Sequence, residues 1–275
     1  TTWGQVPWSF FLNAAIDTLP TAANLQRWNK SNSDKCKLCL GRQTTDHCLN
    51  ICKVGLDTGR WTWRHDNILN YVMESLDTSK YTAYSDLPGK EAPGGGTLPP
   101  ELCVTALKPD IVVVDEKKQE VQIFELTCPL ERNIEERHLF KQNKYAHFAT
   151  DIQSMKVRVR AFEISSRGFI SKRNQTHLQS LHKLCKAGIK LSTFMKNIST
   201  LSIYSSYHLW LCRSDPLFAK PPYLKSSFHK KINISLQQCT VADGFPGALV
   251  HQACPWSKSR QLPGNLLSQW ISLAM

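Results

Sequence analysis

A short polar segment, residues 31–64, contains a cluster of cysteine and histidine side chains. Two residues separate Cys36 from Cys39, seven separate Cys39 from His47, and four separate His47 from Cys52. So small a segment cannot form an independent hydrophobic core, whereas three thiolates and one imidazole complete the tetrahedral shell that zinc prefers. We therefore expect a Zn²⁺-binding CCHC knuckle here. Because four protein ligands leave no open position on the metal, its role would be folding rather than catalysis.

The ten cysteines of the chain allow other interpretations of this cluster. The first residues do not have the pattern of a secretory leader, and we therefore expect a metal site rather than a disulfide framework. The four side chains could also be ordinary buried residues, although the segment is very polar for that. Cys48 is an alternative ligand one residue out of register, and we expect it to pack instead.

The densest strand signal lies in segment 108–127, where two runs of β-branched and apolar residues flank a polar turn. Such a pattern is typical of a β-hairpin. A turn centred in the polar residues pairs Val114 with Val121 and Asp110 with Glu125. The hairpin would therefore bring two carboxylates side by side.

Apolar residues that recur at helical spacing predict four helices. They cover residues 61–76, 131–152, 178–185 and 194–211. A further run at 157–164 predicts a third strand, and glycine and proline residues at 84–100 indicate a loop. These elements together predict an α+β domain.

The chain divides into four parts by composition. They are a linker segment at 1–30, the knuckle at 31–64, a larger domain at 65–215 and a tail at 216–275. Apolar periodicity is lost after Asp215 and prolines cluster there, so we expect the tail to be disordered or a read-through extension. The first residues lack an initiating Met, and we expect the chain to be a fragment of a longer protein.

Charge is distributed unevenly in this chain, whose formal net charge is +12. Residues 137–215 contain 14 Lys and Arg but only 3 Asp and Glu, whereas residues 1–136 contain 14 and 18. A basic region with interleaved aromatic residues is typical of a protein that binds nucleic acid, and background basicity is the alternative. No apolar run approaches the roughly 20 residues that span a bilayer, so we expect no membrane partner.

The acids and lysines around the hairpin suit phosphodiester hydrolysis. That reaction uses a divalent metal, and Mg²⁺ is usually held by one or two carboxylates, which Asp110 and Glu125 would supply. A lysine can orient or deprotonate the attacking water, and Lys141 and Lys144 each lie four residues before an apolar position of the next helix. The alternative is a surface hairpin with two ordinary acids, followed by two solvated lysines.

The order of these motifs along the chain is similar to that of a known family. After the knuckle come Arg64-His65-Asp66-Asn67-Ile68, Lys108-Pro109-Asp110, Glu125-Leu126-Thr127-Cys128-Pro129-Leu130-Glu131, Lys141-x-x-Lys144-Tyr145 and Glu163-Ile164-Ser165-Ser166-Arg167-Gly168-Phe169. Over about residues 5–213, the chain resembles the C-terminal part of site-specific non-LTR retrotransposon polyproteins. Those polyproteins carry a restriction-like endonuclease after their reverse transcriptase.

The resemblance implies a restriction-endonuclease-like core of the PD-(D/E)xK type, in which a mixed central sheet is flanked by helices. It also implies that Asp110 and Glu125 bind Mg²⁺ or Mn²⁺. Ordinary members place a catalytic lysine two residues after the second acid, where this chain has Thr127. The resembled family is known for a lysine displaced to the following helix, which matches Lys141 or Lys144, and we prefer Lys144.

The activity implied by the resemblance is nicking of genomic DNA, so that a 3′-hydroxyl primes reverse transcription of the element's RNA. DNA is then the expected partner, the element's RNA is a further candidate, and a reverse transcriptase domain is expected upstream. The expected location is the nucleus. Arg64, His65 and Arg167 are candidate DNA contacts, each with a structural role as the alternative. A non-catalytic nucleic-acid-binding remnant and a zinc-stabilised protein-interaction module are the competing functions.

Overall fold

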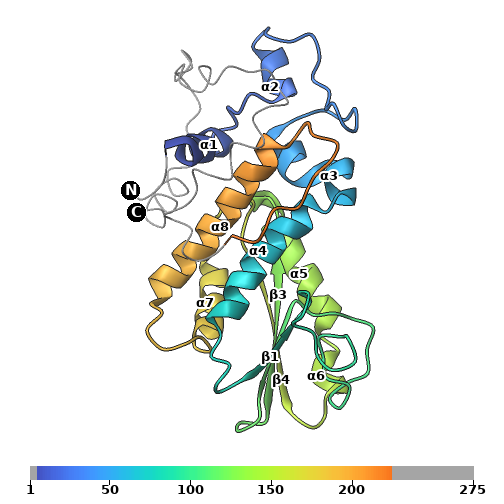
Figure 1. The fold of residues 1–275 in the computed structure, drawn as a ribbon, viewed down its shortest axis with the longest axis vertical. Coiled ribbons are helices and arrows are strands. Elements are labelled where there is room, and N and C mark those ends of the chain that lie inside the picture. Colours follow the sequence, from blue (N-terminus) through green and yellow to red (C-terminus); the bar gives the residue numbers. More distant parts are fainter. Residues whose placement is uncertain (1–4, 225–275) are drawn as a thin grey trace.

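The computed structural model describes residues 5–224 of the 275-residue chain. Its centre is a sheet, of which β1, β3 and β4 are labelled in Figure 1. The strands of this sheet lie in the order β1-β2-β3-β4. The strands are β1 (Thr82–Ser85), β2 (Ile111–Asp115), β3 (Glu120–Thr127) and β4 (Lys156–Glu163). Neighbouring strands are antiparallel except for β3 and β4, which are parallel. The fold is therefore α+β with a mixed sheet, as predicted.

Helices precede, connect and follow these strands. Before the sheet come α1 (Gln5–Ala15), α2 (Ala22–Arg27), the π-helical turn η1 (His47–Ile51), α3 (Lys53–Asp57) and α4 (Arg60–Ser75). The connection from β3 to β4 contains the 3-10 turn η2 (Glu131–Asn133), α5 (Ile134–Tyr145) and α6 (Phe148–Asp151). After β4 come α7 (Lys172–His182) and α8 (Leu191–Leu211). Within residues 5–224, no helix has the length and apolar character to cross a membrane.

The β2–β3 hairpin has the predicted register, with Val114 opposite Val121. Successive residues of a strand face opposite sides of a sheet. One face of this sheet packs against α4, α7 and α8, and the other packs against α5 and α6. Because both faces are covered, every residue of β2 is buried, which explains its continuous apolar run.

A second apolar cluster attaches the Cys/His segment to this body. Leu49 of η1 packs with Phe10 of α1 and with Tyr207 and Trp210 of α8. Leu49 is completely buried. The segment therefore shares a core with α1 and α8.

Several predicted element boundaries differ from the structure. The helix predicted over 178–185 is α7, which begins earlier, at Lys172, and ends at His182. The loop predicted over 84–100 is wrong at its start, because β1 extends to Ser85. The single helix predicted over 131–152 is also wrong, because α5 ends at Tyr145 and α6 begins at Phe148.

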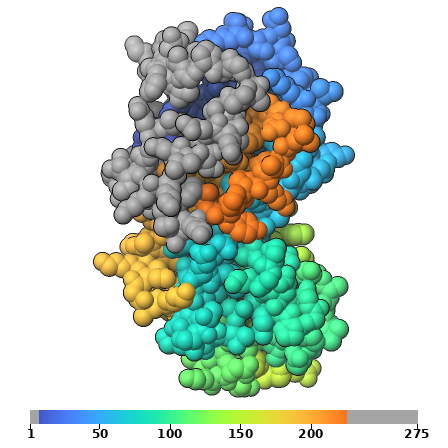
Figure 2. All heavy atoms as spheres, in the orientation of Figure 1, coloured from blue at the N-terminus to red at the C-terminus, as the bar shows by residue number. Residues whose placement is uncertain are grey.

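The first residues of the predicted tail, 216–224, lie along α4 (Figure 1). The indole Nε1 of Trp63 donates to the carbonyl oxygen of Pro221 at 2.8 Å. In the space-filling view these residues, in orange with the end of α8, form part of the visible surface (Figure 2). Contacts with α4 thus place this stretch, which was expected to belong to a disordered or read-through tail. The remainder of the predicted tail, 225–275, lies outside the described residues.

Candidate functional site

The predicted Cys/His cluster is assembled in the structure. The ligand atoms of Cys36, Cys39, His47 and Cys52 all lie within 4.8 Å of one another. Cys39 Sγ is 3.3 Å from His47 Nε2 and 3.7 Å from Cys52 Sγ. A tetrahedron with zinc–sulfur bonds of about 2.3 Å has edges of about 3.8 Å. The cluster could therefore bind a metal ion such as zinc.

Two backbone turns bring these four side chains together. The N–H of Cys36 donates to Gly41 O at 2.7 Å, which closes the loop that carries Cys39. The N–H of Cys52 donates to His47 O at 3.0 Å, which places both side chains on one side of the π-helical turn. A Cβ added to Gly41 would lie 3.1 Å from His47 Cε1 and 3.4 Å from Cys39 Sγ. The glycine thus leaves room for the ligands.

The protonation chemistry of the cluster also fits a metal. Burial lowers the pKa of His47, which favours the neutral imidazole that a metal ion needs. Burial raises the pKa of Cys52 to about 11, against a backbone hydrogen bond from Gly55 that lowers it. A bound cation would favour the thiolate of such a cysteine. Cys48 packs against the cluster formed by α1 and α8, outside the ligand set, as predicted.

A second polar centre lies at one end of the β2–β3 hairpin. Asp110 directly precedes β2, and Glu125 belongs to β3. The N–H of Asp110 donates to Glu125 Oε1 at 2.9 Å, and the N–H of Leu126 donates to Asp110 Oδ2 at 2.7 Å. The Asp110 side chain is 11% exposed and the Glu125 side chain is fully buried. The hairpin therefore holds two acids together where water screens their charges poorly.

Lys141 of α5 reaches both of these acids. Its Nζ is 2.7 Å from Glu125 Oε2 and 3.7 Å from Asp110 Oδ2. Lys144 is exposed, and its Nζ lies 4.7 Å from the centroid of the Tyr145 ring. The preference for Lys144 is therefore corrected in favour of Lys141. Lys141 lies one helical turn before the buried Tyr145 and shares its side of α5.

His65 of α4 joins the same centre. Its Nε2 is 3.3 Å from Asp110 Oδ2, and its Nδ1 is 3.1 Å from Asp66 Oδ1. This candidate DNA contact thus faces two carboxylates of its own chain. Local sequence offers a His-Asp pair near the start of α4, but no signal for the acid that the ring meets across the fold.

The charges of the centre shift one another's pKa. For Asp110, burial opposes ionisation, but the charges of His65 and Lys141 outweigh it and lower the pKa. For Glu125, burial and the Asp110 charge raise the pKa, and Lys141 opposes them only in part. For His65, burial favours the neutral ring, but contacts with Asp110 and Asp66 hold the pKa well above its ordinary value. The charged state of the acids at this centre therefore depends on the charged state of the cations, and the reverse also holds.

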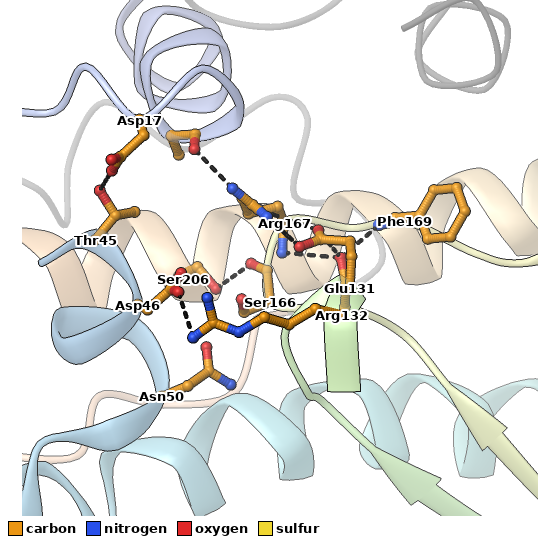
Figure 3. Close-up of polar contacts among 12 residues, drawn as sticks. Asp17, Thr45, Asp46, Asn50, Glu131, Arg132, Ser166, Arg167, Phe169 and Ser206 are labelled. Atoms are coloured by element: carbon orange, nitrogen blue, oxygen red, sulfur yellow. Dashed lines mark hydrogen bonds and ion pairs between the residues drawn. The ribbon is translucent and has the colours of Figure 1, made fainter. Parts of the chain in front are cut away.

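The other two candidate DNA contacts, Arg64 and Arg167, are engaged within the fold. Arg64 is 1% exposed, and its guanidinium donates to Leu49 O at 3.0 Å and to Cys128 O at 3.2 Å. Arg167 forms a two-pronged ion pair with Glu131 (Figure 3). Both guanidinium groups thus make contacts within the fold, which favours the structural role that was the alternative, although the Arg167 side chain is 19% exposed.

Further polar contacts dock the Cys/His segment on residues that follow β3, and the contact between Arg132 and Asp46 is drawn in Figure 3. Arg132 Nη2 lies 2.7 Å from Asp46 Oδ2, and Asn50 Nδ2 donates to Cys128 O at 2.8 Å. The carbonyl of Cys128 therefore accepts from both Asn50 and Arg64. The Cys/His segment and the acid centre are linked to the same short stretch of chain.

A comparison with models of known protein families finds no match, and a search of curated proteins finds no relative.

Proposed function

We propose that the chain contains a divalent-metal-dependent DNA endonuclease with a restriction-endonuclease-like core, preceded by a zinc knuckle. The observation that carries this proposal is the convergence of Asp110, Glu125 and Lys141 at one end of the hairpin. The mixed sheet with helices on both faces is consistent with the core that the sequence resemblance implies.

Asp110 and Glu125 would hold Mg²⁺ or Mn²⁺, since both are hard cations that prefer oxygen ligands. When bound, such an ion neutralises charge on a phosphodiester and lowers the pKa of water. Lys141 would hold the attacking water or a phosphate oxygen beside the two acids. The position of its ammonium group, 2.7 Å from Glu125 Oε2, supports this role.

Charge supports nucleic acid as the substrate. Residues 137–215, which include most of α5 together with β4, α7 and α8, contain 14 Lys and Arg against 3 Asp and Glu. Neutralising phosphates with such residues releases counterions and favours binding. We further propose, from the resemblance alone, that nicking occurs on genomic DNA in the nucleus and primes reverse transcription of an element RNA. An upstream reverse transcriptase would be the partner in that reaction.

A plasmid-nicking assay on the full chain tests the proposal. We expect relaxation of supercoiled DNA with Mg²⁺ or Mn²⁺ and none with EDTA. Asp110→Asn and Lys141→Met should each reduce the rate by at least about 100-fold, because one removes a ligand charge and the other a proton-transfer or electrostatic group. Lys144→Met is the matched control, three residues along the same helix, and should retain most of the activity.

The outcomes separate the competing functions. Equal losses in Lys141→Met and Lys144→Met would contradict the assignment of Lys141. Salt-sensitive DNA binding without nicking by the wild type would favour the non-catalytic remnant. Weak and salt-insensitive DNA binding would favour the protein-interaction module.

A further inference from the structure

The two carboxylate oxygens of Asp110 have different surroundings. Oδ2 accepts from the N–H of Leu126 at 2.7 Å, lies 3.3 Å from His65 Nε2, and is 3.7 Å from Lys141 Nζ. Among residues 5–224, no hydrogen-bond donor reaches Oδ1. Contacts within the described residues thus occupy Oδ2 of this acid, whereas Oδ1 is available to a ligand.

The His65 ring also has a contact on the side opposite Asp110. Its Nδ1 faces Asp66 Oδ1 at 3.1 Å, and the hydroxyl of Tyr223 donates to Asp66 Oδ2 at 3.4 Å. Next to His65 on α4, Arg64 and Asn67 are 1% and 0% exposed, so this part of the helix is packed on several sides. A line of contacts therefore runs from Tyr223 through Asp66 and His65 to Asp110.

The terminal torsion of an aspartate is broad, so a carboxylate needs outside contacts to present one oxygen in a fixed direction. The backbone N–H of Leu126 supplies one such contact at Oδ2, and His65 supplies a second from another element. Groups that hydrogen-bond a metal ligand in this way typically change metal affinity or activity 10- to 100-fold when they are removed.

We infer that His65 is a positioning residue, whose Nε2 contact holds Oδ2 of Asp110 so that Oδ1 is the oxygen presented to a divalent cation. Asp66 holds the ring of His65 in turn, and Tyr223 holds Asp66. This role rests on the proposed function of the Asp110 and Glu125 centre, and it assigns His65 to the protein side of the site rather than to a DNA phosphate.

The test is a Mn²⁺ titration of the full zinc-loaded chain, in which free Mn²⁺ is followed by electron paramagnetic resonance. We expect His65→Ala to weaken Mn²⁺ binding by about 10-fold or more. His65→Gln should lose less, because its amide nitrogen can replace Nε2 of the ring. Thermal unfolding of each variant identifies any that fails to fold.

Nicking rates measured against Mn²⁺ concentration provide a second readout. His65→Ala should raise the Mn²⁺ concentration for half-maximal rate, and saturating Mn²⁺ should restore most of the rate. A folded His65→Ala variant whose rate is low at every Mn²⁺ concentration, with unchanged Mn²⁺ binding, would overturn the inference and favour a direct DNA contact.

Asp110→Asn distinguishes failure of the inference from failure of the proposed function. If Asp110→Asn binds Mn²⁺ like the wild type, the acid centre is not a metal site and the proposed function fails. If Asp110→Asn abolishes binding but His65→Ala binds Mn²⁺ as tightly as the wild type or more tightly, the positioning role alone is wrong.

Discussion

Glu163, at the end of β4, is a buried acid whose carboxyl group has a hydrogen-bond partner for only one of its two oxygens among the described residues. Its side chain is fully buried, Oε1 lies 3.1 Å from His138 Nδ1, and Oε2 has no hydrogen-bond partner among the described residues. Burial raises the pKa of Glu163 from 4.5 to about 7, although Asn174 and Arg173 nearby act to lower it. Folding therefore favours the protonated acid.

This environment predicts a pH-dependent stability. Because the folded pKa lies above the unfolded one, the contribution of Glu163 is fully present below pH 4.5 and is lost as the pH rises through about 7. At about 1.4 kcal/mol per pKa unit, the loss is up to about 3 kcal/mol. Glu163→Gln cannot ionise, so its free energy of unfolding relative to wild type should increase between pH 4 and pH 8.

Urea unfolding of both proteins across this range measures the effect. Burial lowers the pKa of His138, which by itself makes stability rise with pH. Because His138 Nδ1 lies 3.1 Å from Glu163 Oε1, the variant also changes the surroundings of the histidine, and the difference between the two proteins reports the titration of this pair. A difference that is independent of pH would contradict the raised pKa of Glu163.

The two lysines of α5 show what could be predicted at this scale and what could not. Lys141 and Lys144 each stand four residues before an aromatic residue, Tyr145 and Phe148. Sequence spacing alone treats them alike. The helix ends at Tyr145, so the spacing from Lys144 to Phe148 no longer means a shared face. Both lysines lie within α5, and the acids that Lys141 reaches belong to the β2–β3 hairpin, so spacing along the helix alone could not decide between them.

The loop between β4 and α7 packs in direct contact with α8. The hydroxyls of Ser199 and Ser202 each donate at 2.7 Å to loop carbonyls, those of Gly168 and Ser165. Gly168 has φ +81°, and a Cβ added there would lie 2.7 Å from Ile203 and 2.8 Å from Ser199 O. Small residues on both sides thus allow the loop and helix to touch.

Gly168→Ala should therefore destabilise the protein by about 3 kcal/mol or more, the sum of a left-handed backbone penalty and overpacking against α8. Gly95→Ala is the matched control. Gly95 has φ +80° but no atom within 4 Å of an added Cβ, so its cost should be about 1 to 2 kcal/mol. Equal losses in chemical denaturation would mean that contact with α8 contributes nothing.

Local sequence patterns predict the β2–β3 hairpin but contain no signal for strand β1 or for the contact of residues 216–224 with α4. The β2–β3 hairpin has long apolar strands joined by a short polar turn, so its register follows from the sequence between residues 111 and 127. Strand β1 has only four residues, three of which carry a hydroxyl group, and it exists because it pairs with β2. The contact of residues 216–224 with α4 joins positions about 150 residues apart, for which local periodicity contains no signal.

For the molecule as a whole, the Cys/His segment is expected to depend on its metal. From the sequence alone, chelation should unfold residues 31–64 and leave the larger domain largely intact. The shared core of Leu49, Phe10 and Trp210 extends that expectation. Loss of zinc should also loosen α1 and the C-terminal half of α8, while β2 and β3 stay protected.

Hydrogen exchange before and after chelation measures this difference, and cysteine variants identify the ligands. Cys52→Ser should lose bound zinc, whereas Cys48→Ser, four residues earlier, should keep it because Cys48 is outside the ligand set. Faster exchange confined to 31–64 would contradict the shared core. Equal loss of protection in every strand would contradict a separate sheet domain.

The hairpin that holds Asp110 and Glu125 also has a consequence for the order of folding. Its two acids are 15 positions apart, whereas His65 and Lys141 arrive from elements on either side of it. Hairpins form within microseconds, before pairings such as β3 with β4 that close longer loops. We therefore expect an early stage of folding in which the carboxylates of Asp110 and Glu125 approach each other before His65 and Lys141 are in place. Salt or mild acid, which weakens that repulsion, should speed the first phase of refolding.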